Sequence, residues 1–299
     1  MTTQIILNPY AARWEAGKRQ DEIEFALKSA GVSYQLAITN APKEATQIAK
    51  AAAEDGAEAV IAAGGDGTIG EVVNGLMSAA NHEERAPKFG IIPVGTANDL
   101  ACNLEFPLDI PSAAQRIKNG QTRPIDVCQI NDFYFINNAG LGLEPYISII
   151  QADMTNVRGI FRYILATLRG IADNPQWHGK ITWDDGEYEG QITLISLGNG
   201  ARTGGVFFTV PHADPFDGKL SFIYGNIPTR WKIMRALPKI LKPAEGNIAE
   251  HPAVHEIHTT TFTAEFTSPT PAHADGEVFA RAIQRVTCEI LPGRLPLLV

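Results

Sequence analysis

The chain has 299 residues, of which 44% are hydrophobic, so it is long enough to bury two cores and to form two domains. Its formal charge of −8 at pH 7 argues against nucleic acid as the main partner, because phosphate backbones are bound by clustered Lys and Arg. No stretch approaches the roughly 18 consecutive apolar residues of a membrane-spanning helix, and the first residues lack the basic segment of a signal peptide, which predicts a cytoplasmic protein.

Short apolar runs alternate with helical patterns over the first third of the chain. Strands are predicted at 4–7, 34–39, 59–63 and 89–93, and helices at 16–29, 43–53, 67–80, 97–103 and 112–118. This alternation is typical of βαβ units around a parallel sheet.

A glycine-rich loop follows the predicted strand at 59–63, and an amphipathic pattern follows the loop. The loop reads Gly64-Gly65-Asp66-Gly67-Thr68. Glycines let the backbone turn sharply and approach a ligand, while free N–H groups at a helix start favour phosphate oxygens. We interpret the loop as a phosphate cradle, in which Asp66 orders a Mg²⁺ shell or holds the loop. A plain strand-to-helix turn is the alternative.

A second strand, glycine turn and helix start follow at 89–101. The turn reads Val94-Gly95-Thr96-Ala97-Asn98-Asp99. Two such turns at neighbouring strand ends can clamp one nucleotide from both sides, with Thr96 and Asn98 as donors and Asp99 as a metal-binding or substrate-orienting group. Simple capping of the next helix by Thr and Asn is the alternative.

The pattern changes from about residue 126 to β-rich segments punctuated by Gly, Asn and Pro. Strands are predicted at 127–136, 179–183, 191–197, 220–224, 255–266 and 286–290, with helices at 157–172 and 229–241. This is typical of an antiparallel sandwich. Because no long polar linker separates the two parts, we expect them to pack closely with a cleft between them.

The two glycine loops together resemble those of the diacylglycerol kinase catalytic domain family, which includes sphingosine kinases and bacterial lipid kinases. Three further segments extend the resemblance over nearly the whole chain: Asn8-Pro9 after the first strand, the segment 204–220 that contains Gly204-Gly205, Pro211 and Asp217-Gly218, and Ala274-Asp275-Gly276-Glu277. Two departures stand out. Cys102 occupies a position where many relatives carry Arg, and 10–13 replaces a Ser-Gly pair.

The resemblance implies an α/β plus β fold in two domains. The first is an N-terminal α/β nucleotide-binding domain with a parallel sheet, formed by 1–125 with a return of 290–299. The second is a C-terminal antiparallel β-sandwich domain of 126–289 that takes the lipid substrate. The active site is expected in the cleft between them.

The resemblance also implies roles for individual residues. It places ATP around Asn8, Thr39, Gly64, Gly65, Asp66, Gly67, Thr68, Glu71, Gly95, Thr96 and Asn98. It places Asp275 and Glu277 in the catalytic cleft, where one carboxylate accepts the proton of the attacking hydroxyl. Which of the two does so stays open. It implies a structural Mg²⁺ at Asp214, Asp217 and the backbone carbonyl of Lys219, and a β-turn without metal is the alternative.

The function implied is that of an ATP-dependent kinase that phosphorylates a hydroxyl of a membrane lipid. Diacylglycerol, a sphingoid base, ceramide and phosphatidylglycerol all offer such a hydroxyl. Two alternatives are a NAD kinase, which shares the Gly-Gly-Asp-Gly-Thr loop, and a catalytically silent regulator that binds lipid or nucleotide on the same scaffold.

Two basic amphipathic stretches, 157–169 and 229–242, are candidates for peripheral contact with the inner face of the membrane. The second carries five basic residues and no acid on an acidic chain. A solvated helix face over the sandwich is the alternative for each. A homodimer paired through sandwich edges is an alternative to a monomer.

Overall fold

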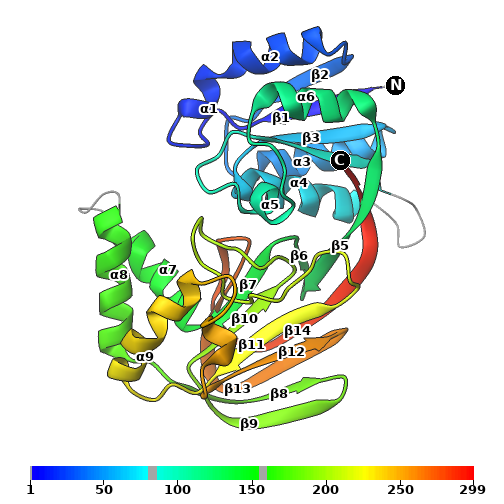
Figure 1. Cartoon of the computed structure of the whole chain (residues 1–299). Coiled ribbons are helices and arrows are strands. Elements are labelled where there is room, and N and C mark those ends of the chain that lie inside the picture. Colours follow the sequence, from blue (N-terminus) through cyan, green and yellow to red (C-terminus); the bar gives the residue numbers. More distant parts are fainter. Residues whose placement is uncertain (1, 80–85, 155–159) are drawn as a thin grey trace.

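The computed structural model describes residues 2–79, 86–154 and 160–299 (Figure 1). The start of the predicted basic stretch 157–169 lies outside these residues. Among the described helices, none is long and apolar enough to cross a membrane.

The N-terminal part is a parallel sheet with helices on both faces. Its strands β4, β3, β1 and β2 lie side by side in that order. They span Thr3–Leu7 (β1), Tyr34–Ile38 (β2), Ala59–Gly64 (β3) and Lys88–Pro93 (β4). The helices are Glu15–Lys18 (α1), Gln20–Ser29 (α2), Glu44–Glu54 (α3), Asp66–Ala79 (α4), Asp99–Asn103 (α5) and Ile110–Asn119 (α6).

Alternation along the central strands produces two cores on opposite faces of this sheet. Val60 and Ala62 face the core that includes α3 and α4, whereas Ile61 and Ala63 face the core that includes α2 and α6. Because both faces are covered, β3 is buried along its whole length, which explains its uninterrupted apolar sequence.

The C-terminal part is antiparallel. Its strands are Thr122–Ile130 (β5), Phe133–Phe135 (β6), Asn138–Gly142 (β7), Trp177–Trp183 (β8), Gly186–Ile192 (β9), Leu194–Gly198 (β10), Leu220–Gly225 (β11), Val254–Thr259 (β12), Thr261–Ala274 (β13) and Glu277–Leu298 (β14). The helices are Leu143–Asp153 (α7), Ile160–Asp173 (α8) and Arg230–Ala236 (α9), with 3-10 turns at Leu237–Leu241 and Ile248–Glu250. The predicted fold class, an α/β part followed by an antiparallel sandwich, is confirmed.

One strand, β14, joins the two parts (Figure 1). It pairs antiparallel with β13 in the sandwich and with β5, and at its far end Leu297 pairs parallel with Phe89 of β4. Leu295 and Leu297 of this end are fully buried in the N-terminal core. The chain therefore ends inside the sheet with which it began.

Two predicted strands are each two strands in the structure, and one strand–helix pair was not predicted. The strand predicted at 127–136 is two strands, because Asn131 adopts a left-handed φ of 48° and turns the chain between β5 and β6. The strand predicted at 255–266 is likewise two, β12 and β13. The pair β7 and α7 was not predicted, because β7 is short and rich in glycine, a composition that favours turns.

Asp126 lies where the two parts meet. Its carboxylate is almost fully buried and accepts hydrogen bonds from the backbone N–H groups of Gly218 (2.7 Å) and Gly293 (2.6 Å). Gly293 lies at the irregularity where β14 passes from the sandwich to the N-terminal sheet, and Gly218 lies in the loop before β11. The carboxylate therefore holds both segments against β5.

We predict that Asp126→Ala lowers the free energy of unfolding by about 3 kcal/mol, because it leaves two backbone donors without an acceptor. Urea unfolding in a buffer with EDTA measures this without interference from cations. Asp132→Ala, which removes an exposed carboxylate on the β5–β6 turn, is the matched control. Equal effects of the two substitutions would contradict the proposed link.

Candidate active site

The two glycine turns predicted from the sequence contact each other at the carboxyl edge of the parallel sheet. The Val94 N–H donates to the Gly64 carbonyl at 3.1 Å. A Cβ atom placed on Gly95 would lie 2.3 Å from the Gly65 Cα, which is closer than atoms can approach. Glycine is therefore required here by the close approach of the two turns.

Asn8, directly after β1, stabilises the first glycine turn. Asn8 Nδ2 donates to Thr68 Oγ1 at 3.0 Å, and Asn8 Oδ1 accepts from the Tyr10 N–H. A Cβ on Gly64 would lie 2.4 Å from the same Thr68 oxygen. Thr39 lies at the end of β2 and is buried, with its N–H bonded to the carbonyl of Leu7. These predicted site residues come together at one edge of the sheet.

In the second glycine turn, Asn98 stabilises the turn itself, whereas the Thr96 side chain is exposed. Asn98 is buried with a left-handed φ of 49°, and its Oδ1 accepts from the Gly95 N–H at 2.9 Å. Asn98 thus holds the turn from within, in contrast to the direct donor role expected from the sequence. Thr96 and Gly67 are exposed, and nothing lies within 4 Å of a Cβ built on Gly67.

Glu71 lies on α4, and Glu277, at the start of β14, lies near it. The Glu71 carboxylate accepts from the backbone N–H groups of Lys43 (3.0 Å) and Ala45 (3.2 Å) at the start of α3. Burial raises the pKa of Glu71, and the Glu277 carboxylate adds to the rise. Glu277 is exposed and does not line the cavity described below.

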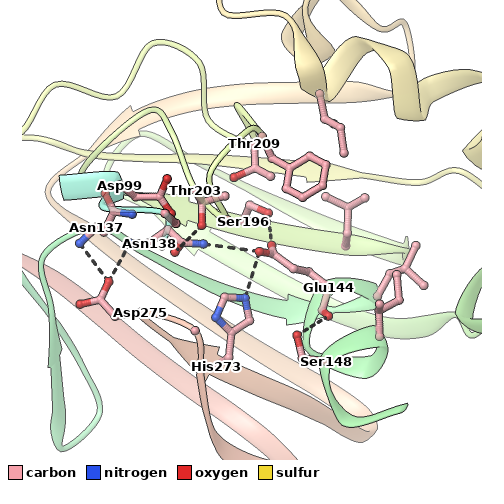
Figure 2. Close-up of a pocket in the computed structure, with 18 of the residues that line it drawn as sticks. Asp99, Asn137, Asn138, Glu144, Ser148, Ser196, Thr203, Thr209, His273 and Asp275 are labelled. Atoms are coloured by element: carbon pink, nitrogen blue, oxygen red, sulfur yellow. Dashed lines mark hydrogen bonds and ion pairs between the residues drawn. The ribbon is translucent and has the colours of Figure 1, made fainter. Parts of the chain in front are cut away.

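Asp275 lies in the turn between β13 and β14 and points at the start of β7 (Figure 2). Its carboxylate accepts three backbone hydrogen bonds of 3.0 Å each, from Ile136, Asn137 and Asn138. Burial nevertheless raises the pKa of Asp275 to about 6. The backbone at Asp275 is left-handed, as it is at Gly276, which makes the tight turn that directs the carboxylate inward.

The carboxylates of Asp66, Asp99 and Asp275 lie close together beside the glycine turns. Asp66 is the first residue of α4, and Asp99, the first of α5, accepts from the Gly205 N–H at 2.9 Å. Burial raises the pKa of each, and repulsion by Asp66 raises those of Asp99 and Asp275 further. Arg202 lies 3.5 Å from Asp99 and partly offsets this negative charge.

Carboxylates held together in this way favour a divalent cation, which relieves their mutual repulsion. No closed cage of three or more Asp, Glu, His or Cys side chains is present in the part of the chain that the structure describes. Mg²⁺ does not need one, since it keeps several waters and binds through one or two carboxylates and substrate phosphates. The residues therefore suit a Mg²⁺ ion that arrives with a nucleotide.

The predicted structural metal site lies elsewhere, in the loop before β11. Asp214 Oδ1 accepts from the Phe216 N–H, and Asp217 Oδ1 accepts from the Lys219 N–H at 2.8 Å, so the segment forms turns by itself. Burial raises the pKa of Asp126, and repulsion by Asp217 and Asp214 adds to it. Asp126 thus lies beside the predicted pair. The sequence analysis missed it, although a carboxylate in a buried strand is unusual enough to signal it.

A cavity of about 450 Å³ opens below the three carboxylates. Asp66, Asp99 and Asp275 line one end, and the rest of the lining includes residues of α7, α8, α9, β10 and β11, of the loops before and after β11 and of the 3-10 turn after α9. The lining there is mostly apolar and includes Leu143, Ile147, Tyr163, Phe207, Ile227 and Ile240. The site therefore joins an acidic, amide-rich end to a long hydrophobic chamber.

One polar cluster interrupts the apolar wall, and the sequence analysis missed it. Glu144, Ser196 and His273 come from α7, β10 and β13, and Figure 2 shows them converging on one side of the cavity. Asn138 of β7 connects this cluster with the segment that binds Asp275. Only the pairing of these distant strands brings the residues together.

Comparison with known proteins agrees with this architecture. Residues 2–130 match the diacylglycerol kinase catalytic domain, and 138–299 match the YegS C-terminal NAD kinase beta sandwich-like domain. A diacylglycerol kinase of Bacillus subtilis is 35% identical over 217 residues, covering 72% of this chain and 70% of the relative. A probable YegS-like lipid kinase of Chromohalobacter salexigens is 30% identical over 272 residues, covering 90% of this chain and 85% of the relative.

Solved structures show the same fold. The crystal structure of a putative diacylglycerol kinase from Bacillus anthracis superimposes with a TM-score of 0.79 at 24% identity, covering 99% of this chain and 96% of that one. A yeast NADH kinase complexed with NADH superimposes with a TM-score of 0.54 at 10% identity, covering 99% and 82%.

These matches confirm the resemblance seen in the sequence motifs. The chain belongs to the diacylglycerol kinase catalytic domain family, and the predicted class of enzyme, a kinase of the lipid kinase type, is confirmed at that level.

We predict that Gly95→Ala weakens ATP binding at least tenfold, because its Cβ would force the two glycine turns apart and move their N–H groups by more than hydrogen-bond tolerance. Isothermal titration calorimetry with ATP and Mg²⁺ measures the affinity. Ala79→Gly, a change of the same size at the far end of α4, is the control. Unchanged affinity in Gly95→Ala would show that the contact is not needed for binding.

Proposed function

We propose that this protein transfers the γ-phosphoryl group of ATP to the hydroxyl of a membrane lipid. The observation that carries the proposal is the cavity, which joins a carboxylate with a raised pKa to a hydrophobic chamber directly beside two phosphate-binding turns. A hydroxyl at the head of an alkyl chain suits both ends of that cavity.

The order of the strands gives the orientation proposed for ATP. The glycine turns follow β3 and β4, and α4 of the first turn approaches the active-site carboxylate, since a Cβ on Gly70 would lie 3.3 Å from the Asp275 Cβ. β1 and β2 lie on the other side of β3. The triphosphate therefore lies over β3 and β4 with its γ end toward Asp275, and the nucleoside lies over β1 and β2, near Asn8 and Thr39.

An exposed aromatic pair stands at the proposed nucleoside end. The rings of Tyr10 and Trp14 meet edge to face with centroids 4.6 Å apart, and both are solvent-exposed. Tyr10 is tied to Asn8, which braces the first glycine turn. Such rings offer a stacking surface for the adenine, in a loop where this chain departs from its relatives.

Asp275 is the proposed general base. The lipid hydroxyl oxygen bonds to the γ-phosphorus as the bond from that phosphorus to its bridging oxygen breaks. The hydroxyl proton passes to the Asp275 carboxylate, and ADP leaves with the bonding electrons. A pKa of about 6 leaves the carboxylate ionised at neutral pH yet basic enough to accept a proton. Glu277 lies outside the cavity and is not assigned this role.

Asp66 and Asp99 are the proposed holders of the Mg²⁺ that accompanies ATP. When bound, this ion neutralises charge that develops on the phosphate oxygens during transfer. The two carboxylates begin neighbouring helices and project into the space between the glycine turns and Asp275.

Two other functions remain as outcomes of the test. A NAD kinase would have to accept a second, polar nucleotide, and the apolar wall of the cavity does not suit one. A silent binding protein has no need of a base, whereas burial here holds one in a reactive range.

The deciding measurement is transfer of radiolabelled γ-phosphate from ATP and Mg²⁺ to lipids in mixed micelles, with NAD as a parallel acceptor. We expect label on lipid and none on NAD. Label on NAD would assign the NAD kinase function instead, and ATP binding without transfer to any acceptor would indicate the silent scaffold.

We predict that Asp275→Asn lowers turnover by about 10²-fold, the usual loss for a missing general base, while ATP affinity changes little. In the wild type, kcat/KM for MgATP should rise with pH through about 6 and level off above, because only the ionised carboxylate accepts the proton. The matched control, Glu277→Gln, should stay within about threefold. A larger loss in the control than in Asp275→Asn would exchange the two roles.

Helices α8 and α9 form a second proposed contact, with the membrane. α8 and α9 line the cavity with their inner sides, while Phe161 and Trp231 are each 70% exposed on their outer sides. Phe161 and Trp231 form the proposed apolar patch, and α9 with the following 3-10 turn adds basic residues, with no acid between 229 and 242. We propose that the patch docks on the anionic inner leaflet, where ATP is available and the cavity can receive lipid.

We predict that the double variant Phe161→Glu and Trp231→Glu weakens binding to phosphatidylglycerol-containing vesicles at least tenfold, because two apolar side chains no longer enter the interface. Cosedimentation measures this binding. Phe25→Glu is the matched control, since Phe25 is 73% exposed but lies on α2 of the N-terminal part. Equal losses in both would place the contact elsewhere.

A further inference from the structure

The polar cluster in the cavity wall is a built site. Ser196 Oγ donates to Glu144 Oε2 at 2.8 Å, and His273 Nε2 lies 3.1 Å from Glu144 Oε1. His273 is almost fully buried, at 3% exposure. A Cβ on Gly140 would lie 2.6 Å from that imidazole nitrogen and 2.9 Å from Glu144 Oε2, so the pair rests directly on the backbone of β7.

Glu144 carries a negative charge in this apolar setting. Burial alone would raise its pKa, but His273, Ser196 and Asn138 together hold the pKa of Glu144 below its usual value. A carboxylate accepts about four hydrogen bonds, and three of these positions face those neighbours. The side chain is 28% exposed and lines the cavity, so one acceptor position remains for a ligand.

The cluster lies close to the proposed reaction centre. The Asn138 backbone N–H donates to Asp275 Oδ1, and its side-chain Nδ2 donates to Glu144 Oε1 at 3.4 Å. The carboxylates of Asp275 and Glu144 are thus linked by two hydrogen bonds through a single residue, Asn138 (Figure 2). Beyond Glu144, the walls formed by residues such as Ile147, Ile227 and Ile240 are apolar.

The order of these surfaces, an acidic end, then the Glu144 carboxylate, then apolar walls, fits the head group and chain of a lipid. A hydroxyl that reaches Asp275 has a charged acceptor beside it before the hydrocarbon begins. An acceptor of this kind binds O–H or N–H groups and repels ester oxygens, which only accept hydrogen bonds. A ligand without a donor would fill the space beside Glu144 and leave its open acceptor position without a partner.

We infer that the lipid substrate carries a second hydrogen-bond donor, a hydroxyl or an N–H, within a few bonds of the hydroxyl that is phosphorylated, and that Glu144 binds it. Monoacylglycerols and long-chain amino alcohols or their amides have this chemistry. Diacylglycerol does not, because its other oxygens are esters. The inference rests on the proposed lipid kinase function and specifies its substrate class.

The test compares kcat/KM of the wild-type protein for four lipids in the same mixed micelles with saturating MgATP. The lipids are 1-oleoylglycerol, its 2-O-methyl ether, 1,2-dioleoylglycerol and N-oleoylsphingosine. The first two differ only in the second donor. We expect 1-oleoylglycerol or the amide to exceed both lipids without a second donor by at least tenfold, as expected when a site built for a donor receives none.

The variant Glu144→Gln should reduce this preference to within about threefold by lowering the rates of the donor lipids alone, because a neutral amide is a weaker acceptor. Glu189→Gln, which removes an exposed charge on β9, should keep the full preference. The wild-type ratio needs no substitution and decides the question even if Glu144→Gln does not fold.

Each outcome has a distinct meaning. Dioleoylglycerol or the methyl ether used as well as 1-oleoylglycerol would overturn the inference and leave the lipid kinase function intact. Equal losses on all lipids in Glu144→Gln would show that Glu144 only supports the fold. Absence of transfer to every lipid, despite ATP binding, would overturn the proposed function together with the inference.

Discussion

The three backbone hydrogen bonds that converge on the Asp275 carboxylate organise this molecule. They tie the turn between β13 and β14 to residues 136–138, which lead into β7, and they place the turn against α4 of the N-terminal part. A carboxylate so deeply placed costs free energy that only several oriented donors can offset. The same arrangement that holds the turn therefore leaves a carboxylate whose pKa burial has raised.

The cavity below that turn divides into zones of different polarity. Its upper end contains acidic side chains and backbone amides, and its lower walls are built from α7, α8 and α9. Arg202, in the loop before β11, is the positive group beside Asp99. The negative potential is thus concentrated where a cation-bound triphosphate would lie, and it fades where hydrocarbon would lie.

The two glycine turns could be predicted from the sequence because their signal is local. A strand, a glycine turn and a helix start are adjacent in the chain, and steric crowding at Gly64 and Gly95 permits no other residue. Asp275 was identified through a motif of the same local kind. The sequence did not separate Asp275, which lines the cavity, from Glu277, which is exposed at the start of β14.

The polar cluster in the cavity wall left no such signal. Glu144, Ser196 and His273 are separated by long stretches of chain, and only the pairing of β7 with both β10 and β13 brings them together. The short strand β7 was missed because its two glycines favour turns. Arg202 was missed too, since a single charged residue in a loop does not reveal its partner.

The continuous strand β14 has a thermodynamic consequence. Because one strand belongs to the sandwich and to the N-terminal sheet, neither part can lose its order without taking hydrogen bonds from the other. Local opening of one part is then coupled to opening of the other, in one cooperative unit. A ligand that fills the cavity, whose lining includes Asp66 and Asp99, would in this way stabilise both parts. Binding of a ligand to one part therefore raises the stability of the other part as well.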